Sequence, residues 1–127
     1  LGDVYKRQMS NKLRITVGSS SFDATLEDNE TVKAFKKLLP MTVNMPDLNR
    51  NEKYYYLSGS LPTAASNPGT ILTGDLMLYG SNCVVLFYES FSTSYSYTRL
   101  GRVNNSSGLA SALGSGSVTV TFELQKE

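Results

Sequence analysis

The chain has 127 residues, a length that fits one domain with a single core. Its 12 Lys and Arg residues nearly balance 11 Asp and Glu residues, so a formal net charge of +1 gives no reason to expect a nucleic-acid partner or an anionic membrane surface. It has no histidine, which excludes Ser-His-Asp and Cys-His nucleophile pairs, imidazole bases and every zinc site that uses histidine.

The N-terminal residues 1–8, LGDVYKRQ, precede Met9 and lack the charged-then-apolar layout of a signal peptide. We expect them to be a non-native or disordered leader, and residues 9–127 to form the domain. A start at Met9 predicts a cytoplasmic protein, whereas the loss of an upstream leader predicts an exported one. The longest apolar run, at residues 83–88, has six residues, and a membrane-spanning helix needs about 20, so no membrane span is expected.

Short stretches of alternating or continuous apolar residues predict a chain made mostly of β-strands. In chain order they are residues 12–17, 22–26, 41–45, 53–57, 71–72, 76–79, 83–88, 97–100 and 118–124. Turn-forming residues separate them, and the longest loops are expected at 58–69 and 89–96. The continuous run 83–88 indicates burial on both faces, and its Cys83, the only cysteine, is expected to act as a buried hydrophobe. Gly101 is expected to weaken the end of its strand.

One clear helix and one short helix are expected between the strands. Asp28 and Asn29 supply an N-cap, after which apolar residues recur at helical spacing until Pro40. The neighbouring acids Asp28 and Glu30 are therefore assigned to this cap and to the helix dipole, rather than to acid–base or calcium chemistry. A helix of one or two turns is predicted at residues 108–113.

These elements predict a mainly β fold, an antiparallel β-barrel or sandwich, because no strand-helix-strand rhythm supports a parallel sheet. Both chain ends are expected to be strands. Pairing of the first hairpin with the last strand closes a sheet and removes its exposed edges, which favours a barrel over an open sheet.

Two features are candidates for a binding site. Strand alternation puts Tyr54 and Tyr56 on one face and Tyr55 on the other, so at least one face presents phenol rings to solvent or to a pocket, unless all three are structural. The glycine-containing turns lack the spacing and the following helix that a phosphate-binding loop needs, so no nucleotide is expected.

The second candidate is Arg99, which follows a loop rich in aromatic and hydroxyl side chains. A guanidinium beside aromatic rings can hold a carbonyl or a carboxylate. The alternatives are a solvated strand position and an ion pair with Glu52 or Glu89.

Six motifs, taken in order along the chain, carry a family resemblance. They are Leu26-Glu27-Asp28-Asn29 with Thr31, Leu38-Leu39-Pro40, Asn51-Glu52-Lys53, Thr73-Gly74-Asp75-Leu76, Leu86-Phe87-Tyr88 and Leu100-Gly101-Arg102-Val103. With this set the chain resembles the bacterial cyclophilin-like family of small proteins over residues 12–124. The resemblance implies a closed eight-stranded β-barrel with one clear and one short helix, one at each end.

True cyclophilins are peptidyl-prolyl isomerases, in which an arginine stabilises the twisted X-Pro amide within an apolar pocket. The barrier is about 18–20 kcal/mol, so catalysis requires tighter binding of the twisted amide than of either planar isomer. This chain lacks their phenylalanine-histidine-arginine motif and has the strand Tyr54-Tyr55-Tyr56 in the similar position. The stretches 74–77 and 86–88 resemble those that line the proline pocket.

We therefore predict a cyclophilin-like protein that binds a peptide or small ligand in an aromatic pocket on the barrel. The expected contacts are Met77 and Phe87 as apolar lining, and Tyr56, Tyr79 and Arg99 as polar contacts. No catalytic residue, metal or cofactor is expected. Two alternatives stay open: an isomerase in which Arg99 replaces the usual arginine, and an extracellular glycan-binding or adhesion module, suggested by 17 Ser, 11 Thr and 8 Tyr.

Overall fold

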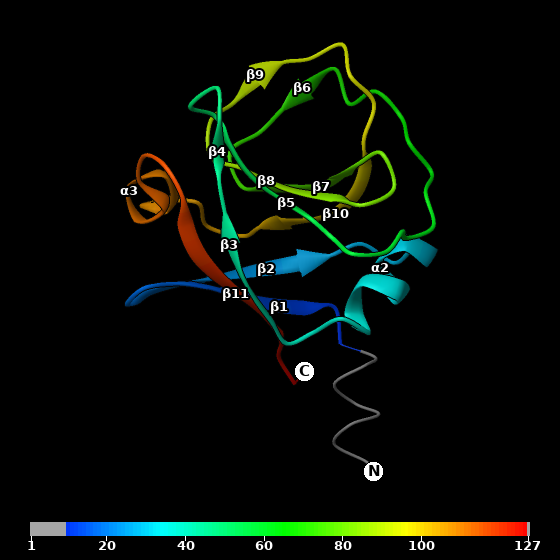
Figure 1. Ribbon diagram of the computed structural model, residues 1–127, viewed down its shortest axis with the longest axis horizontal. Helices are drawn as coiled ribbons and strands as arrows, with labels where there is room; N and C mark the ends of the chain where they lie inside the picture. The colour runs from blue at the N-terminus through cyan, green and yellow to red at the C-terminus, as the bar shows by residue number, and fades with distance from the viewer. Residues whose placement is uncertain (1–9, 127) are drawn as a thin grey trace.

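The computed structural model describes residues 10–126, which form a curled β-sheet with two helices (Figure 1). The elements are β1 (Lys12–Val17), β2 (Ser20–Leu26), α2 (Glu30–Lys36), β3 (Met41–Met45), β4 (Asp47–Leu48), β5 (Glu52–Tyr56), β6 (Thr70–Ile71), β7 (Asp75–Tyr79), β8 (Cys83–Phe87), β9 (Phe91–Ser92), β10 (Thr98–Val103), α3 (Leu109–Leu113) and β11 (Val118–Leu124). The leader expected at residues 1–8 lies outside the described part of the chain.

The main sheet has nine strands in the order β3-β11-β1-β2-β10-β7-β8-β5-β4, and every neighbouring pair is antiparallel. Only Pro46 separates β3 from β4, the two strands that end this order, so the chain itself joins the two edges. The backbone N–H of Tyr54 donates to the carbonyl of Pro46 at 3.1 Å across this junction. The sheet is thus a nearly closed barrel, in which β1 of the first hairpin pairs with the last strand, as predicted.

The expected mainly β barrel is confirmed, with a different strand count. Eight strands were expected and the barrel sheet has nine, because proline has no N–H to donate and divides one long strand into β3 and β4. The two expected helices are present, on opposite sides of the barrel in Figure 1.

The barrel interior is filled by alternate side chains of its strands. Ile15 of β1 and Val120 of β11 are fully buried there, as is Phe35 of α2. The Phe35 ring meets Phe122 edge to face, with 6.3 Å between ring centroids. The interior is therefore a packed core, and any binding site must lie outside it.

The start of α2 is the N-cap that the sequence predicted. The Asn29 side chain accepts the N–H of Val32 at 2.8 Å and donates to the carbonyl of Arg99 at 3.0 Å, while Glu30 lies in the first turn. The helix ends at Lys36, earlier than the expected Pro40, because the next N–H groups bond three residues back rather than four. No helix between residues 10 and 126 is long and apolar enough to cross a membrane.

In the second half of the chain, the structure corrects the expectation for the loop at 89–96 and refines the one for Gly101. The loop expected at 89–96 contains β9, which pairs with β6 to form a separate two-stranded sheet. β10 continues past Gly101 to Val103, but its register with β7 shifts between Arg99 and Gly101, an irregularity that a glycine in a strand often marks. A Cβ at Gly101 would lie 2.4 Å from the carbonyl oxygen of Thr25, so glycine allows β2 to pair closely with β10.

Lys53 of β5 joins three segments at one end of the barrel. Its side chain is fully buried, and its ammonium donates to Asp47 of β4 at 3.1 Å and to the backbone carbonyls of Gly114 and Gly116, ahead of β11. The ammonium also lies 5.3 Å from the ring centroid of Tyr88. Four partners compensate for the loss of water around this charge.

Lys53→Met is expected to lower the free energy of unfolding by about 3 kcal/mol, because it leaves Asp47 and two carbonyls without their partner. Lys33→Met is the matched control, since Lys33 pairs with Glu30 at the same 3.1 Å on the surface, and exposed pairs contribute about 0.5 kcal/mol or less. Urea unfolding measures both variants. Equal, small losses would show that the buried pair does not stabilise the barrel.

Candidate functional site

Strand register places all five predicted contact residues on the outer face of one barrel wall. These residues are Tyr56, Met77, Tyr79, Phe87 and Arg99. Residues directly opposite one another in antiparallel strands share a face. Tyr56 and Tyr79 both lie opposite Cys83 of β8, one on each side, and Met77 lies opposite Arg99. Phe87 follows Cys83 by four positions on β8, so alternation puts it on the same face.

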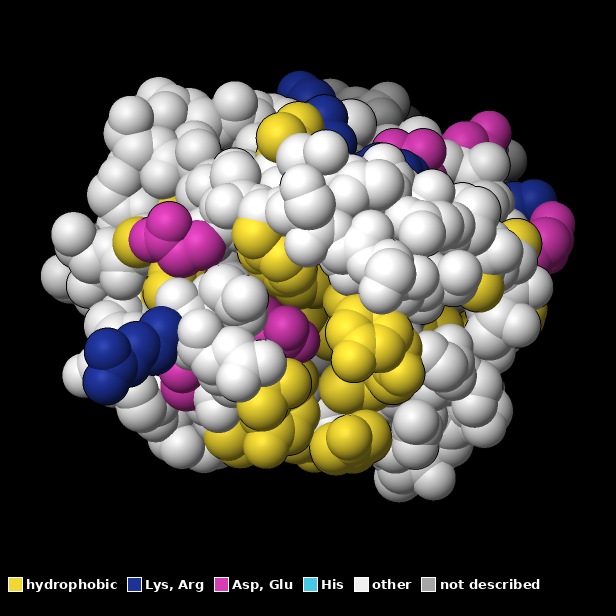
Figure 2. Space-filling model, turned by 90° about the horizontal axis from the view of Figure 1, so that it is seen from above, with side chains coloured by type: hydrophobic (Ala, Val, Ile, Leu, Met, Phe, Trp, Pro, Cys, Tyr) yellow, Lys and Arg dark blue, Asp and Glu magenta, His cyan; other side chains and the backbone are white. Residues whose placement is uncertain are grey.

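A hollow of about 320 Å³ opens on this outer face. Its lining is Leu48, Asn49, Glu52, Tyr54, Tyr56, Tyr79, Cys83, Val85, Tyr95 and Tyr97. Five of the seven tyrosines within residues 10–126 are in this set. Figure 2 shows hydrophobic side chains gathered around a recess that contains an acidic side chain.

Of the five predicted contact residues, two lie on the rim of the hollow and two lie beneath it. Tyr56 and Tyr79 are on its rim, with 62% and 46% of their surface exposed. Met77 and Phe87 are fully buried beneath it, in a cluster with Ile71 and other apolar residues. They support the hollow from below and do not line it.

Arg99 lies apart from the hollow, beside a buried carboxylate. One of its terminal nitrogens is 4.0 Å from Oδ1 of Asp75, and Arg102 Nε donates to the same oxygen at 2.6 Å. Asp75 is fully buried and also accepts the N–H of Leu72 at 2.9 Å. Asp75 is the ion-pair partner of Arg99, in place of the glutamates that the sequence suggested.

Aromatic contacts hold the tyrosines of the hollow in place. Tyr79 meets Tyr95 and Tyr97 at centroid distances of 6.0 and 5.6 Å, and Tyr97 meets Phe87 edge to face at 5.6 Å. Tyr54 and Tyr56 form a second edge-to-face pair at 5.8 Å. Edge-to-face geometry is one of the arrangements that such rings prefer, so these contacts favour the observed positions of the rim tyrosines.

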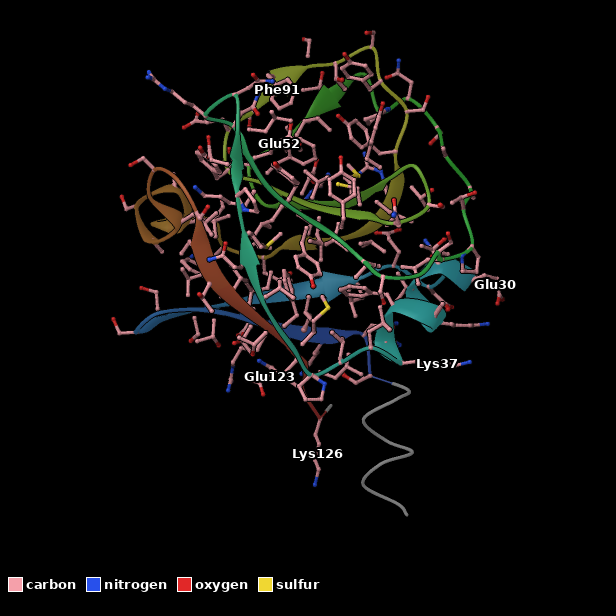
Figure 3. The ribbon with its side chains drawn as sticks, in the orientation of Figure 1. Glu30, Lys37, Glu52, Phe91, Glu123 and Lys126 are labelled. Carbon is pink, nitrogen blue, oxygen red and sulfur yellow. The ribbon has the colours of Figure 1, made fainter. Side chains whose placement is uncertain are left out.

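Glu52 is the acidic residue of the lining. It lies opposite Leu48 on one side and Phe87 on the other, and burial, with a smaller contribution from the charge of Asp47, raises its pKa from 4.5 to about 7. Within residues 10–126 no hydrogen bond or ion pair engages its carboxyl group. Figure 3 shows Glu52 in the part of the molecule where β4, β5 and β9 gather, near Phe91.

The nearest cation in the sequence, Lys53, does not neutralise Glu52. Alternation along β5 turns Lys53 toward the barrel interior, where its charge is used by Asp47 and two carbonyls. Across the lining there is one carboxyl group and, among the residues described, no lysine or arginine.

The thiol of the lining is the buried group that the sequence predicted. Cys83 is 5% exposed, and burial followed by the charge of Glu52 raises the pKa of its thiol. A thiol whose pKa is raised is a weak nucleophile. Elsewhere in residues 10–126, no three Cys, Asp or Glu side chains gather in a way that could hold a metal ion.

Of the ten described lining residues, sequence reasoning singled out Tyr54, Tyr56 and Tyr79 as binding candidates and missed the others, Glu52 and Tyr95 among them. Glu52 was considered only as a partner of Arg99, although Glu52, Tyr54 and Tyr56 alternate on one strand face and so carried a signal. Tyr95 lies in a segment without regular secondary structure, so no periodic pattern marked it as a lining residue.

Comparison with known proteins places this barrel in a family. The chain matches the cyclophilin-like family over residues 15–123. It belongs to that family. The solution structure of the hypothetical protein AF2241 from Archaeoglobus fulgidus is similar to it, with a TM-score of 0.68 and 21% identity, covering 91% of this chain and 95% of that chain. A search of curated proteins found no match.

These findings confirm the cyclophilin-like part of the resemblance. The archaeal structure, at 21% identity, shows the shared fold and nothing about a ligand. What the hollow binds must therefore be inferred from the residues that line it.

Glu52→Gln is expected to stabilise the protein at pH 8. The pKa of Glu52 rises from 4.5 to about 7 on folding, so its contribution to stability is fully present below pH 4.5 and is lost as the pH passes 7. Gln does not titrate, so the gain in urea midpoint should shrink as the pH falls toward 4.5. A gain that is the same at both pH values would contradict the raised pKa.

Proposed function

We propose that this cyclophilin-like protein is a binding module that holds a peptide or a small ligand in the hollow on the outer barrel wall. The hollow of about 320 Å³, with five tyrosines around it, is the observation that supports this. Ligand sites are typically concave, mostly apolar, and supplied with a few polar groups. The hollow is concave, and its lining combines aromatic rings with hydroxyl, amide and carboxyl groups, so it is more polar than a typical ligand site.

The tyrosines suit such a role because each offers a broad ring and a hydroxyl group. Tyr56, Tyr79 and Tyr95 expose their rings on the rim, while Tyr97 is 5% exposed in the floor. Tyrosine is among the residues that contribute most to binding interfaces. Rings already held by their neighbours lose little conformational freedom when a ligand binds, which favours affinity.

An isomerase receives less support from the same residues. In cyclophilins an arginine stabilises the twisted X-Pro amide, whereas the described lining here has no Lys or Arg, and its charged side chain is the acid Glu52. Arg99 shares the outer face but lies beside Asp75. The glycan-binding alternative drew on the Ser, Thr and Tyr content. The described lining supplies five Tyr but no Ser or Thr, so it supports this alternative only through its tyrosines.

A ligand in the hollow should be visible by NMR. When a panel of acetylated tripeptides with Phe, Pro, Leu, Lys or Glu at the centre is titrated into the full chain, amide shifts are expected around Tyr79 and Val85. Tyr79→Ala should weaken binding by at least about tenfold, the effect of losing one aromatic contact of 1.4 kcal/mol or more.

Leu38→Ala is the control for that experiment. Leu38 is 42% exposed, close to the 46% of Tyr79, and lines a different hollow beside β3. The proposal fails if shifts gather around Leu38 instead, or if Tyr79→Ala leaves the affinity unchanged.

The isomerase alternative is tested separately, by NMR exchange spectroscopy on an Ala-Pro peptide. We expect the protein to leave the cis–trans exchange rate at its uncatalysed value, because no cation lines the hollow within residues 10–126. Acceleration that Arg99→Ala abolishes would overturn this expectation and establish an enzyme. Acceleration that survives the substitution would exclude Arg99 as its source.

A further inference from the structure

We propose that the hollow selects an organic cation, an alkylammonium group that lies between the carboxylate of Glu52 and the faces of the surrounding tyrosine rings. This inference rests on the proposed binding function and adds the chemical class of the ligand. The shared chemistry is a primary ammonium on an alkyl chain, whether it belongs to a free amine or to a lysine side chain of a peptide.

The carboxyl group of Glu52 has no partner among the residues that the structure describes. The neighbouring Lys53 is turned to the other face of β5 and bonded there. A half-buried carboxylate without a counter-charge gains more from a cation than one that is already paired. The fold therefore leaves one negative charge for a ligand to neutralise.

Two pairs of tyrosine rings around the hollow meet edge to face. Tyr54 meets Tyr56 at an interplanar angle of 75°, and Tyr79 meets Tyr95 at 86°. In each edge-to-face pair, the ring that contributes its edge keeps both faces free of its partner. The face of an aromatic ring is the negative end of its quadrupole and attracts a cation.

Charge and size exclude other ligand classes. An anion would approach the charge of Glu52 in a partly buried setting, where repulsion is strong. The volume of about 320 Å³ lies at the lower end of the range for ligand sites and fits an alkyl chain with an ammonium group. A neutral alkyl chain would fit the space but would leave the carboxylate without a partner.

The same geometry makes the affinity depend on pH. A proton and an ammonium group compete for the carboxyl group of Glu52, whose pKa is about 7 because of burial first and the charge of Asp47 second. Below pH 7 each unit of acidification should weaken cation binding by up to about tenfold.

The other ionisable groups near Glu52 do not change charge in this range. Burial raises the pKa of Cys83 on β8 and of Tyr97 ahead of β10 above their ordinary values of 9.0 and 10.0. Burial opposes ionisation of Asp47 on β4, but hydrogen bonds from Tyr88 and Lys53 outweigh it and hold its pKa below 3.8. A pH effect near 7 would thus report on Glu52.

The test compares charged and neutral probes of matched shape, by calorimetry and NMR on the full chain. The peptide arm uses acetyl-Gly-Lys-Gly-amide and its 2-aminoheptanoyl analogue, in which a methyl group replaces the ammonium. The free arm uses n-butylamine and 1-butanol. At pH 7.5 we expect each cation to bind at least tenfold more tightly than its neutral analogue, and the tighter arm identifies the source of the ammonium.

Two variants locate the effect. Glu52→Gln removes the charge and should abolish the preference for the cations together with its pH dependence. Glu123→Gln makes the same chemical change on β11, and Figure 3 shows Glu123 at the opposite end of the molecule. This variant should change neither the preference for the cations nor its pH dependence. The pH series on the unaltered chain is an independent test that needs no substitution.

Each result decides the inference. Equal affinities for charged and neutral probes, with shifts at the hollow, would overturn the cation preference and leave the binding function standing. Absence of shifts at the hollow with all four probes would also overturn it, and the binding function is then judged by the tripeptide panel. A preference that survives Glu52→Gln would place the cation elsewhere.

Discussion

The wall of the barrel separates two neighbouring charges, Lys53 and Glu52, because successive side chains of a strand point to opposite faces. Inside, the ammonium of Lys53 bonds to Asp47 and to two carbonyls ahead of β11, and so ties the end of the barrel together. Outside, among the lining residues that the structure describes, Glu52 meets no charge of opposite sign. Lys53 thus stabilises the barrel, and Glu52, the residue before it, is a candidate ligand-binding group.

The outer face of this wall is buried more than a barrel surface normally is. The pair β6 and β9 brings Ile71 and Phe91 to the cluster that contains Met77 and Phe87. This cover explains why β8 is apolar along its whole length, since one of its faces meets the barrel core and the other meets this cluster. Where the cover ends, the tyrosines and Glu52 surround the hollow.

Much of the fold could be predicted because it depends on local patterns. Alternation identified β1, β2 and β11, and the Asn29 cap identified the start of α2. The tyrosine face of β5 and the shared face of Met77, Tyr79 and the other expected contacts follow from the same periodicity. The strand count alone did not distinguish a barrel from a sandwich. The expected pairing of the first hairpin with the last strand favoured the barrel, and the resemblance to cyclophilins implied the same.

The rest depends on contacts between distant parts of the chain. Tyr97 reaches the floor of the hollow because it pairs with Ser66 in an isolated bridge, and Phe91 reaches the cluster beneath the hollow because β9 pairs with β6. Arg99 was predicted as a contact from its aromatic neighbours in sequence, but in space it pairs with the carboxylate of Asp75 at 4.0 Å. No local pattern encodes these pairings.

The central claim is that Glu52 is a carboxyl group without a counter-charge in a partly buried hollow. Its most direct test is a titration of the Glu52 side-chain carboxyl carbon by carbon-13 NMR in the free protein. The account predicts a pKa of about 7, raised by burial and by the charge of Asp47. A pKa near the ordinary 4.5 would show that the carboxyl group is hydrated or already paired, and would contradict the account.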